Sequence, residues 1–463
     1  MLVIPTSLPV LDRNSTVAII GGGFSGTMQA INLLRHDGPA AILIERRESR
    51  LGRGVAYSAA HPDHLLNVRA GNMSALPDDP THFVRWLVRE GLGDASTFVP
   101  RTTYGQYLSE MLDNAAQSAG SRLKIVPATA VVIRQEAGRQ VITLADGRSI
   151  EADALVLAMG NLPPHAPPGF HESALGPDVY ADDPWAGDIC EGLTSDDAVL
   201  LLGSGLTAID AALLLDAKGF RGRIIALSRR GLVPHAHWDQ PRSPSEIAEL
   251  PPTQASDLTR FVRSRAQERP WRDAVDDLRP LTQRLWAACA PIQRERFLRH
   301  LRPYWDIHRH RLAPQVAARI AQLQAEGRLG FVAGKTVSCD PGAGFLNVTL
   351  RPRGESNSET LKVRRAVNCT GPQGDLLRTH DPLLGQLLAS GTIRPDQLRL
   401  GLDIDDQSRV IGRDGNANDS VFAIGPMTRG GLWEVVAVPD IRHQTWTLAR
   451  RLANAHWVGG EGL

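Results

Sequence analysis

The sequence of 463 residues lacks the cysteine patterns that mark metal sites and redox pairs. It has four cysteines, and the closest two, Cys339 and Cys369, are 30 residues apart. No C-x-x-C or C-x4-C occurs, which excludes disulfide-reductase chemistry and gives no zinc-ligand spacing. We therefore expect reduced thiols in a reducing compartment, and no bound metal.

An excess of charge and a long hydrophobic run are also lacking. The formal net charge is +1, so neither a nucleic-acid partner nor an anionic membrane surface is indicated. The most apolar stretch, AVLLLGSGLTAIDAALLL at 198–215, is interrupted by Ser204, Thr207 and Asp210 and falls short of a membrane span.

The first residues have no basic region of a secretory signal, so we expect a cytoplasmic protein. The length allows two or three domains, and the oligomeric state is not predicted.

A glycine turn lies near the start, in VAIIGGGFSG. The β-branched run 17–20 predicts a buried parallel strand, 27–34 a helix, and 40–44 a second strand. A strand, a G-x-G-x-x-G turn, a helix and a strand in this order are typical of a dinucleotide-binding unit, whereas an isolated glycine turn is common in structural loops.

Each position of this first turn has a physical role. Gly21 permits the tight turn, Gly23 lets the backbone approach a pyrophosphate, and Gly26 lets the helix pack against the strand. The helix N-terminus offers free N–H groups to the phosphates. Glu45 ends the second strand and can accept hydrogen bonds from a ribose, as expected for FAD.

The stretch 198–215 repeats this order. It predicts a strand at 199–202, a helix at 206–215 and a second strand at 223–227. The turn between them, formed by Gly203, Gly205 and Ala208, is the G-x-G-x-x-A variant.

The second turn differs from the first at the ribose-binding position. Ser228, Arg229 and Arg230 stand where the first unit has a carboxylate. Such a group can bind a 2′-phosphate through charge-assisted hydrogen bonds, so we predict NADPH in preference to NADH. The alternative is a solvated basic loop. The two turns together predict two different dinucleotides, FAD and a nicotinamide cofactor.

These elements predict an α/β fold with two Rossmann-like dinucleotide-binding domains. Strands ending in glycine at 154–160 and 367–371 bracket the second turn, and 421–426 predicts a strand that approaches the flavin. We predict a discontinuous FAD domain at 1–195 and 366–463, with an inserted NAD(P)H domain at 196–365. The arginine-rich region 234–330 predicts a helical insertion within the second domain.

The motifs resemble a known family over almost the full chain. The sequence is similar to the flavoprotein monooxygenase-like family that contains a bacterial FAD-dependent urate hydroxylase and an aspartate N-oxygenase that forms nitrosuccinate. The matching motifs are IIGGGFSG, GRGVAYS with HLLNV, LVLAMGNLPP, DDPW, GSGLTAID, SRRGLVPHAH, WDIHRHR, and AIGP followed by GLWEV.

The resemblance implies FAD at the first turn and places the GVAY and LLNV loops beside the flavin. Many flavoproteins carry Asp after the strand-end glycine to hold the ribityl chain, but Pro426 follows Gly425 here. Arg101 can hold the pyrophosphate or pair on the surface. The residues expected at FAD are Gly21, Gly23, Phe24, Ser25, Gly26, Glu45, Arg46, Asn67, Arg101, Val131, Gly160 and Gly425.

No catalytic residue is assigned, because flavin monooxygenases need no side-chain nucleophile. The candidates near flavin or substrate are Asn67, Arg429, Trp433 and Glu434. Alternatively, Trp433 lies in the core and Glu434 pairs with Arg442. HRHR at 308–311 can hold an anionic substrate or form a solvated helix face, and we favour the latter. His61 and His64 can be catalytic or lie on the surface.

The resemblance implies an NAD(P)H-dependent monooxygenase that uses a flavin hydroperoxide, molecular oxygen and a small-molecule substrate. The expected substrate is urate, hydroxylated to 5-hydroxyisourate in purine breakdown. One alternative is N-oxygenation of an amine or an amino acid such as aspartate. Others are a reductase that passes electrons to a quinone or a partner protein, and a flavin-binding sensor without turnover.

Overall fold

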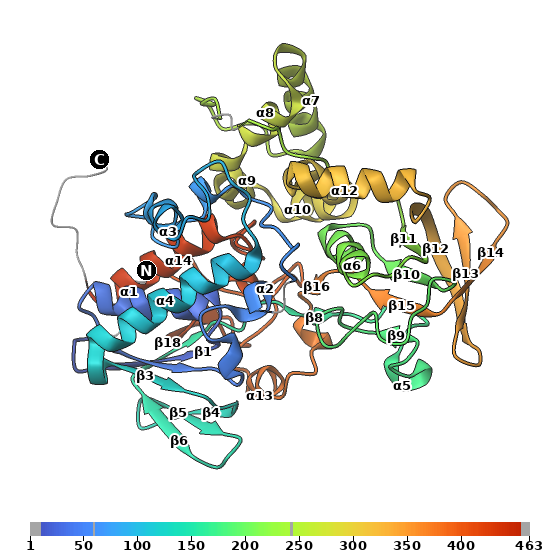
Figure 1. Ribbon diagram of the computed structural model, residues 1–463. Coiled ribbons are helices and arrows are strands. Elements are labelled where there is room, and N and C mark those ends of the chain that lie inside the picture. Colours follow the sequence, from blue (N-terminus) through green and yellow to red (C-terminus); the bar gives the residue numbers. More distant parts are fainter. Residues whose placement is uncertain (1–10, 59–60, 241–243, 455–463) are drawn as a thin grey trace. The chain divides into compact units, whose positions relative to one another are not determined.

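The computed structural model describes residues 11–58, 61–240 and 244–454. Their chain divides into two compact units. The first unit comprises the described residues of 1–58, 69–162 and 374–463, and the second comprises those of 59–68 and 163–373. Each unit contains its own sheet (Figure 1).

The first unit is built on a six-stranded sheet. Its order is β17 (Arg409–Ile411), β18 (Ala417–Ala423), β7 (Ala154–Leu157), β1 (Thr16–Ile20), β2 (Ala40–Ile44) and β3 (Leu123–Val126). All neighbours are parallel except β17 and β18. Strands buried on both faces need continuous apolar runs, and β1 and β7 supply them.

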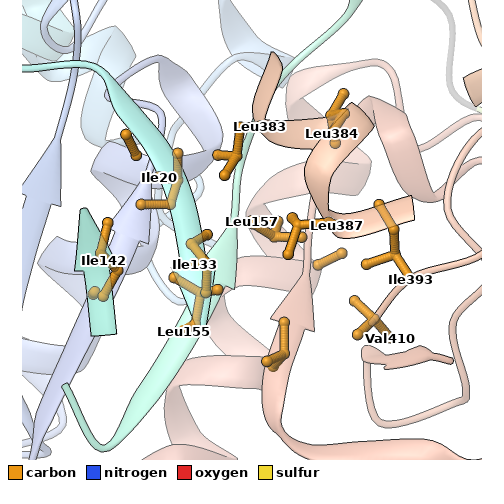
Figure 2. Close-up of a cluster of buried hydrophobic side chains, with 14 of the residues drawn as sticks. Ile20, Ile133, Ile142, Leu155, Leu157, Leu383, Leu384, Leu387, Ile393 and Val410 are labelled. Carbon is orange, nitrogen blue, oxygen red and sulfur yellow. The ribbon is translucent and has the colours of Figure 1, made fainter. Parts of the chain in front are cut away.

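Alternate side chains of β1 point to opposite faces of this sheet. Val17 and Ile19 pack with α1 (Phe24–Arg35), α4 (Arg101–Ala119) and α14 (Val438–Leu452). Ala18 and Ile20 pack on the other face, in the cluster of Figure 2. That cluster contains residues of α13 (Pro382–Ser390) and of a second sheet of β4 (Ala130–Glu136), β5 (Arg139–Leu144) and β6 (Ser149–Ala152). The sheet is thus covered on both faces (Figure 1).

Shorter elements complete the first unit. They are η1 (Glu48–Arg50), α2 (Gly54–Ser58), η2 (Ala70–Asn72), α3 (His82–Glu90), η3 (Gly120–Arg122), η6 (Leu376–Arg378) and η7 (Pro426–Thr428). Aromatic side chains of α2, α3 and α4 pack together, including Tyr57, Phe83 and Tyr104. Burial raises the pKa of Tyr57 to about 12, so its phenol stays protonated at neutral pH.

The second unit is built on a seven-stranded sheet. Its order is β14 (Glu359–Val363), β13 (Leu346–Pro352), β12 (Leu329–Pro341), β11 (Arg223–Ser228), β10 (Ala198–Leu202), β15 (Arg365–Asn368) and β9 (Tyr180–Ala181). The strands from β12 to β9 are parallel, and β13 and β14 continue the sheet as antiparallel strands. The strand β10 leads into α6 (Leu206–Ala217), and α5 spans Glu172–Leu175. Strands β8 (Leu162–Pro164) and β16 (Pro372–Gln373) form a separate pair.

Helices fill the chain between β11 and β12. They are α7 (Ala255–Glu268), α8 (Trp271–Asp276), η4 (Arg279–Leu281), α9 (Thr282–Ala288), α10 (Pro291–Arg296), the π-helical turn η5 (Phe297–Leu301), α11 (Arg302–Arg309) and α12 (Pro314–Ala325). A small core around Leu278, Leu281 and Leu285 holds part of this insertion together. The predicted helical insertion at 234–330 corresponds to this region.

The domain boundaries differ from those expected. The second unit begins at 163 and ends at 373, where the sequence suggested 196 and 365. The reason is strand pairing: β15 pairs with β10, and β9 pairs with β15, so both edges of the insertion belong to the second sheet. Residues 61–68 also belong to the second unit, which their distance along the chain does not suggest.

Candidate functional site

The first glycine turn connects β1 to α1. Gly21 has φ +105°, a conformation that favours glycine, and a Cβ there would overlap the carbonyl oxygen of Ala158. A Cβ at Gly26 would overlap the carbonyl oxygen of Gly21. These contacts give Gly21 and Gly26 the roles of tight turn and close helix packing that the sequence predicts.

The middle of this turn leaves little room for side chains. Gly23 is the N-cap of α1, and a Cβ there would lie 3.3 Å from the Cα of Gly54. Phe24 and Ser25 form the first turn of α1, whose N–H groups have no partner within the helix. Gly23 is half-buried, so its backbone stays partly open to a ligand group that lies against the helix N-terminus.

The carboxylate of Glu45 is fixed by the turn itself. Its two oxygens accept hydrogen bonds from the backbone N–H groups of Gly22 (2.8 Å) and Arg47 (3.0 Å). A carboxylate has about four lone-pair sites, so it can also accept hydrogen bonds from a ribose. A Cβ at Gly22 would lie 2.8 Å from the Cβ of Glu45, which explains a fourth glycine that the G-x-G-x-x-G pattern does not require.

Replacing Glu45 by glutamine should destabilise the first unit. One of the two oxygens becomes an NH₂ donor that faces a backbone donor, which costs about 1–3 kcal/mol of unfolding free energy. Urea denaturation would measure this loss. Glu48→Gln, at an exposed position three residues further on, should change it by no more than about 0.5 kcal/mol. Equal effects of the two variants would contradict a fixing role for Glu45.

The strand-end glycine of β18 lies over the same turn. Gly425 has φ +81°, and a Cβ there would lie 2.5 Å from Ser25 Oγ. Its N–H donates to Gln444 Oε1 of α14 (2.8 Å), and Gln444 Nε2 donates to Thr428 Oγ1 (3.1 Å). The segment that the sequence predicted to approach the flavin is thus held against the start of α1.

The other residues expected at FAD are more scattered. Arg101 begins α4, and its positive charge acts to lower the pKa of Tyr57. Arg46 is exposed after β2, Val131 is half-buried in β4, and Gly160 follows β7 with φ +70°. Asn67 lies in the second unit, where its carbonyl oxygen accepts a hydrogen bond from His237 Nε2 (3.0 Å).

The candidate substrate residues after β18 are buried. Trp433 and Glu434 are 8% and 6% exposed, and Glu434 has φ +68°, which is uncommon for a residue with a side chain. Arg442 donates to the carbonyl oxygen of Ser74 (2.8 Å), and the pairing of Glu434 with Arg442 stays a prediction. Trp433 lies in the core, as one of the two interpretations predicted.

Arg429 and a carboxylate that the sequence did not single out shape the neighbouring loop. Arg429 Nε donates to the carbonyl oxygen of Leu400 (3.1 Å). Asp396 accepts hydrogen bonds from the N–H groups of Leu398, Leu400 and Gly401, and burial raises its pKa above the ordinary value. No motif marks Asp396, because its acceptor role depends on how the loop folds back.

The second glycine turn reproduces the first within its own unit. Gly203 has φ +135°, and a Cβ there would overlap the carbonyl oxygen of Cys369, which follows β15. Gly205 is the N-cap of α6 with φ −83° and ψ −167°, close to the −73° and −167° of Gly23. A Cβ at Gly205 would meet no described atom within 4 Å. Ala208 is buried in the first turns of α6.

The end of β11 carries the predicted nucleotide-binding residues. The hydroxyl of Ser228 lies 2.8 Å from that of Ser204 and accepts a hydrogen bond from the N–H of Gly231 (3.0 Å). Ser228 therefore closes a turn around the two arginines. Arg229 is exposed and Arg230 is half-buried, and neither forms an ion pair with another described residue.

The histidine and arginine candidates have structural contacts. His64 is 1% exposed, so the surface interpretation is wrong for it: its Nδ1 accepts from the N–H of His61 and its Nε2 donates to the carbonyl oxygen of Asp210 (2.9 Å). In 308–311, Arg311 is 1% exposed and makes two hydrogen bonds to Asp276. The expectation of a solvated helix face is wrong for Arg311, because its charge is neutralised inside the insertion.

The four cysteines are free thiols, and burial is the main cause that raises the pKa of each. The pKa rises to about 11 for Cys190 and for Cys339. Among the described residues, no group of three or more His, Cys, Asp or Glu side chains is arranged to hold a metal ion. Along the same residues, no helix has both the length and the apolar character needed to cross a bilayer.

Comparisons with known proteins agree with this fold. Residues 18–162 match a family described as FAD-NAD(P)-binding. The chain is 25% identical over 158 residues to the 3-dehydro-bile acid delta(4,6)-reductase of Clostridium scindens, a match that covers 31% of this chain and 38% of that enzyme. The matched part is thus well under two thirds of the reductase.

Two solved structures are similar over nearly the whole chain. The ornithine N-hydroxylase of Kutzneria sp. 744, with reduced FAD, NADP+ and L-ornithine, has a TM-score of 0.62 at 17% identity and covers 96% of this chain and 99% of its own. The cadaverine monooxygenase of Erwinia amylovora, bound to FAD, has a TM-score of 0.66 at 13% identity and covers 95% of each chain. The predicted α/β fold with Rossmann-like sheets is confirmed, and the chain shares this fold with the two enzymes. Within it, residues 18–162 form the region that matches the FAD-NAD(P)-binding family.

Proposed function

We propose that the protein is an NAD(P)H-dependent FAD monooxygenase. The proposal depends on one observation: the glycine turn occurs twice, and the strand after each turn is followed by side chains of opposite charge. The first unit has the carboxylate of Glu45 after β2, and the second has Arg229 and Arg230 after β11. A carboxylate suits a ribose hydroxyl and repels a 2′-phosphate, whereas arginine attracts one.

The residues present fit the two dinucleotides. In each unit a glycine at the helix N-cap lets a phosphate reach the first N–H groups of the helix. Gly21, Gly23, Phe24, Ser25 and Gly26 would hold the FAD pyrophosphate, and Gly203, Gly205 and Ala208 that of NAD(P)H. FAD would supply hydride acceptance and oxygen activation when bound. The protein's contribution is to bind, orient and exclude water.

The proposed substrate is an amine or an amino acid. The two similar structures described above are an ornithine N-hydroxylase and a cadaverine monooxygenase, whose named substrates are an amino acid and an amine. Urate, the substrate expected from the family resemblance, gains no support from them and is retained only as a competing candidate. A reductase without oxygen insertion is the other candidate, because the partial sequence match is to a reductase.

NADPH oxidation by the purified flavin-loaded protein in air tests these candidates. Ornithine, lysine, cadaverine, aspartate and urate are added separately, and hydrogen peroxide is assayed in parallel. We expect an amine or amino acid to stimulate oxidation with little peroxide release and to yield an N-oxygenated product. Stimulation by urate alone, with loss of its absorbance, would establish urate hydroxylation. Oxidation that quinones accelerate and none of the five substrates changes would favour the reductase.

A further inference from the structure

The turn after β11 is a closed structure that presents two arginines. Ser204 Oγ donates to the carbonyl oxygen of Leu232 (2.5 Å), and the Ser228 hydroxyl accepts the N–H of Gly231. Gly231 has φ +62°, and a Cβ there would lie 3.0 Å from that of Ala333 in β12. Because these contacts occupy the Ser228 hydroxyl, Arg229 and Arg230 are left as the groups that can face a phosphate.

An aromatic side chain of the helical insertion lies beside one of these arginines. The guanidinium carbon of Arg230 is 5.8 Å from the ring centroid of Tyr304 in α11. Tyr304 is 42% exposed, so its ring does not belong to the core of the insertion. The π-helical turn η5 directly precedes α11, and such turns are frequent at functional sites.

The position of Tyr304 relative to Arg230 is fixed by the segment that carries the arginine. The N–H of His235 donates to the carbonyl oxygen of Ile307 (3.1 Å), and the N–H of Leu312 donates to the carbonyl oxygen of His235 (2.8 Å). The ring of His235 packs at 4.8 Å against those of His308 and Trp271. The helix α11 and the chain 228–237 are therefore joined by hydrogen bonds and ring contacts within one unit.

We propose that Tyr304 is a specificity-determining residue that orients Arg230 for the 2′-phosphate of NADPH. A guanidinium that lies over an aromatic ring keeps its N–H edge free for a bidentate hydrogen bond to phosphate, and less conformational entropy is lost on binding. The insertion then contributes directly to the choice between NADPH and NADH. This inference rests on the proposed nicotinamide site of the second unit.

Binding of 2′,5′-ADP and of 5′-AMP to the flavin-loaded full chain, measured by calorimetry, tests the inference without turnover. These ligands differ by the 2′-phosphate alone. Arg230→Gln should weaken 2′,5′-ADP binding by about tenfold or more and leave 5′-AMP unchanged. Tyr304→Leu should weaken 2′,5′-ADP binding about two- to fivefold, again without effect on 5′-AMP.

Matched variants separate orientation of Arg230 from direct contact. Tyr304→Phe keeps the ring and should bind as the wild type does. Tyr304→Leu should have no further effect when Arg230 is already glutamine, because its effect passes through the arginine. Arg260→Gln, at an exposed arginine of the same insertion paired with Asp257, is the control that should change nothing.

Several results would overturn the inference. If Tyr304→Leu weakened both ligands equally, or if its effect persisted in the Arg230→Gln background, the tyrosine would have another role. A wild type that binds 2′,5′-ADP and 5′-AMP equally would remove the phosphate preference and leave the nucleotide site standing. A wild type that binds neither would instead remove the nicotinamide assignment on which the inference rests.

Discussion

Replacement of Gly21 by alanine is expected to abolish FAD retention and to destabilise the first unit by about 2–5 kcal/mol. Gly21 has φ +105°, which an L-residue adopts only at a cost of about 1–2 kcal/mol. A Cβ there would also overlap the carbonyl oxygen of Ala158, the residue after β7, whose N–H donates to the carbonyl oxygen of Ile20 and which therefore cannot easily move away. The turn must then open where the FAD pyrophosphate is proposed to bind.

The flavin absorbance of the purified protein and its urea denaturation midpoint measure this effect. Gly138→Ala is the matched control in the same unit: its φ is +82°, but a Cβ there meets nothing within 4 Å. The control thus carries the backbone penalty without the overlap, and it should keep its flavin. A Gly21→Ala protein that is yellow and as stable as the control would refute the assignment of the first turn.

Much of the backbone of both proposed nucleotide sites could be predicted from the sequence, because each is a local pattern. The turns at Gly21 and Gly203 follow short apolar strands and precede helices, and the structure has these elements within three residues of the expected bounds. Local backbone geometry determines such positions, so spacing alone is informative. The same holds for Glu45, which is the first residue after β2.

The features that the sequence did not predict depend on contacts between distant segments. The boundary at 373 follows from β15 pairing with β10, and an apolar run such as VNCTG does not indicate which sheet it will join. Residues 61–68 join the second unit through the hydrogen bond of His64 to Asp210 and that of His237 to Asn67. The burial of Arg311 depends on Asp276, 35 residues away.

The equivalent change in the second unit, Gly203→Ala, should have a different outcome. Gly203 has φ +135°, and a Cβ there would overlap the carbonyl oxygen of Cys369 after β15, as at the first turn. The expected destabilisation is again about 2–5 kcal/mol, but it falls on the second sheet. We expect a protein that keeps its flavin. NADPH should reduce this flavin at least about 30-fold more slowly than it reduces the wild type's, since 2–5 kcal/mol corresponds to a factor of about 30 to several thousand.

The rate of anaerobic flavin reduction by NADPH measures this effect separately from oxygen chemistry. The rate is monitored through the decrease in flavin absorbance. Gly176→Ala is the matched control in the second unit, with φ +82° and no atom within 4 Å of a Cβ. Dithionite should reduce the flavin of Gly203→Ala normally, because a chemical reductant needs no nucleotide site. If NADPH still reduced this variant at the wild-type rate, the second turn would not hold the nicotinamide cofactor. If the variant lost its flavin, the two turns would not act independently, because damage to the second would then reach the first.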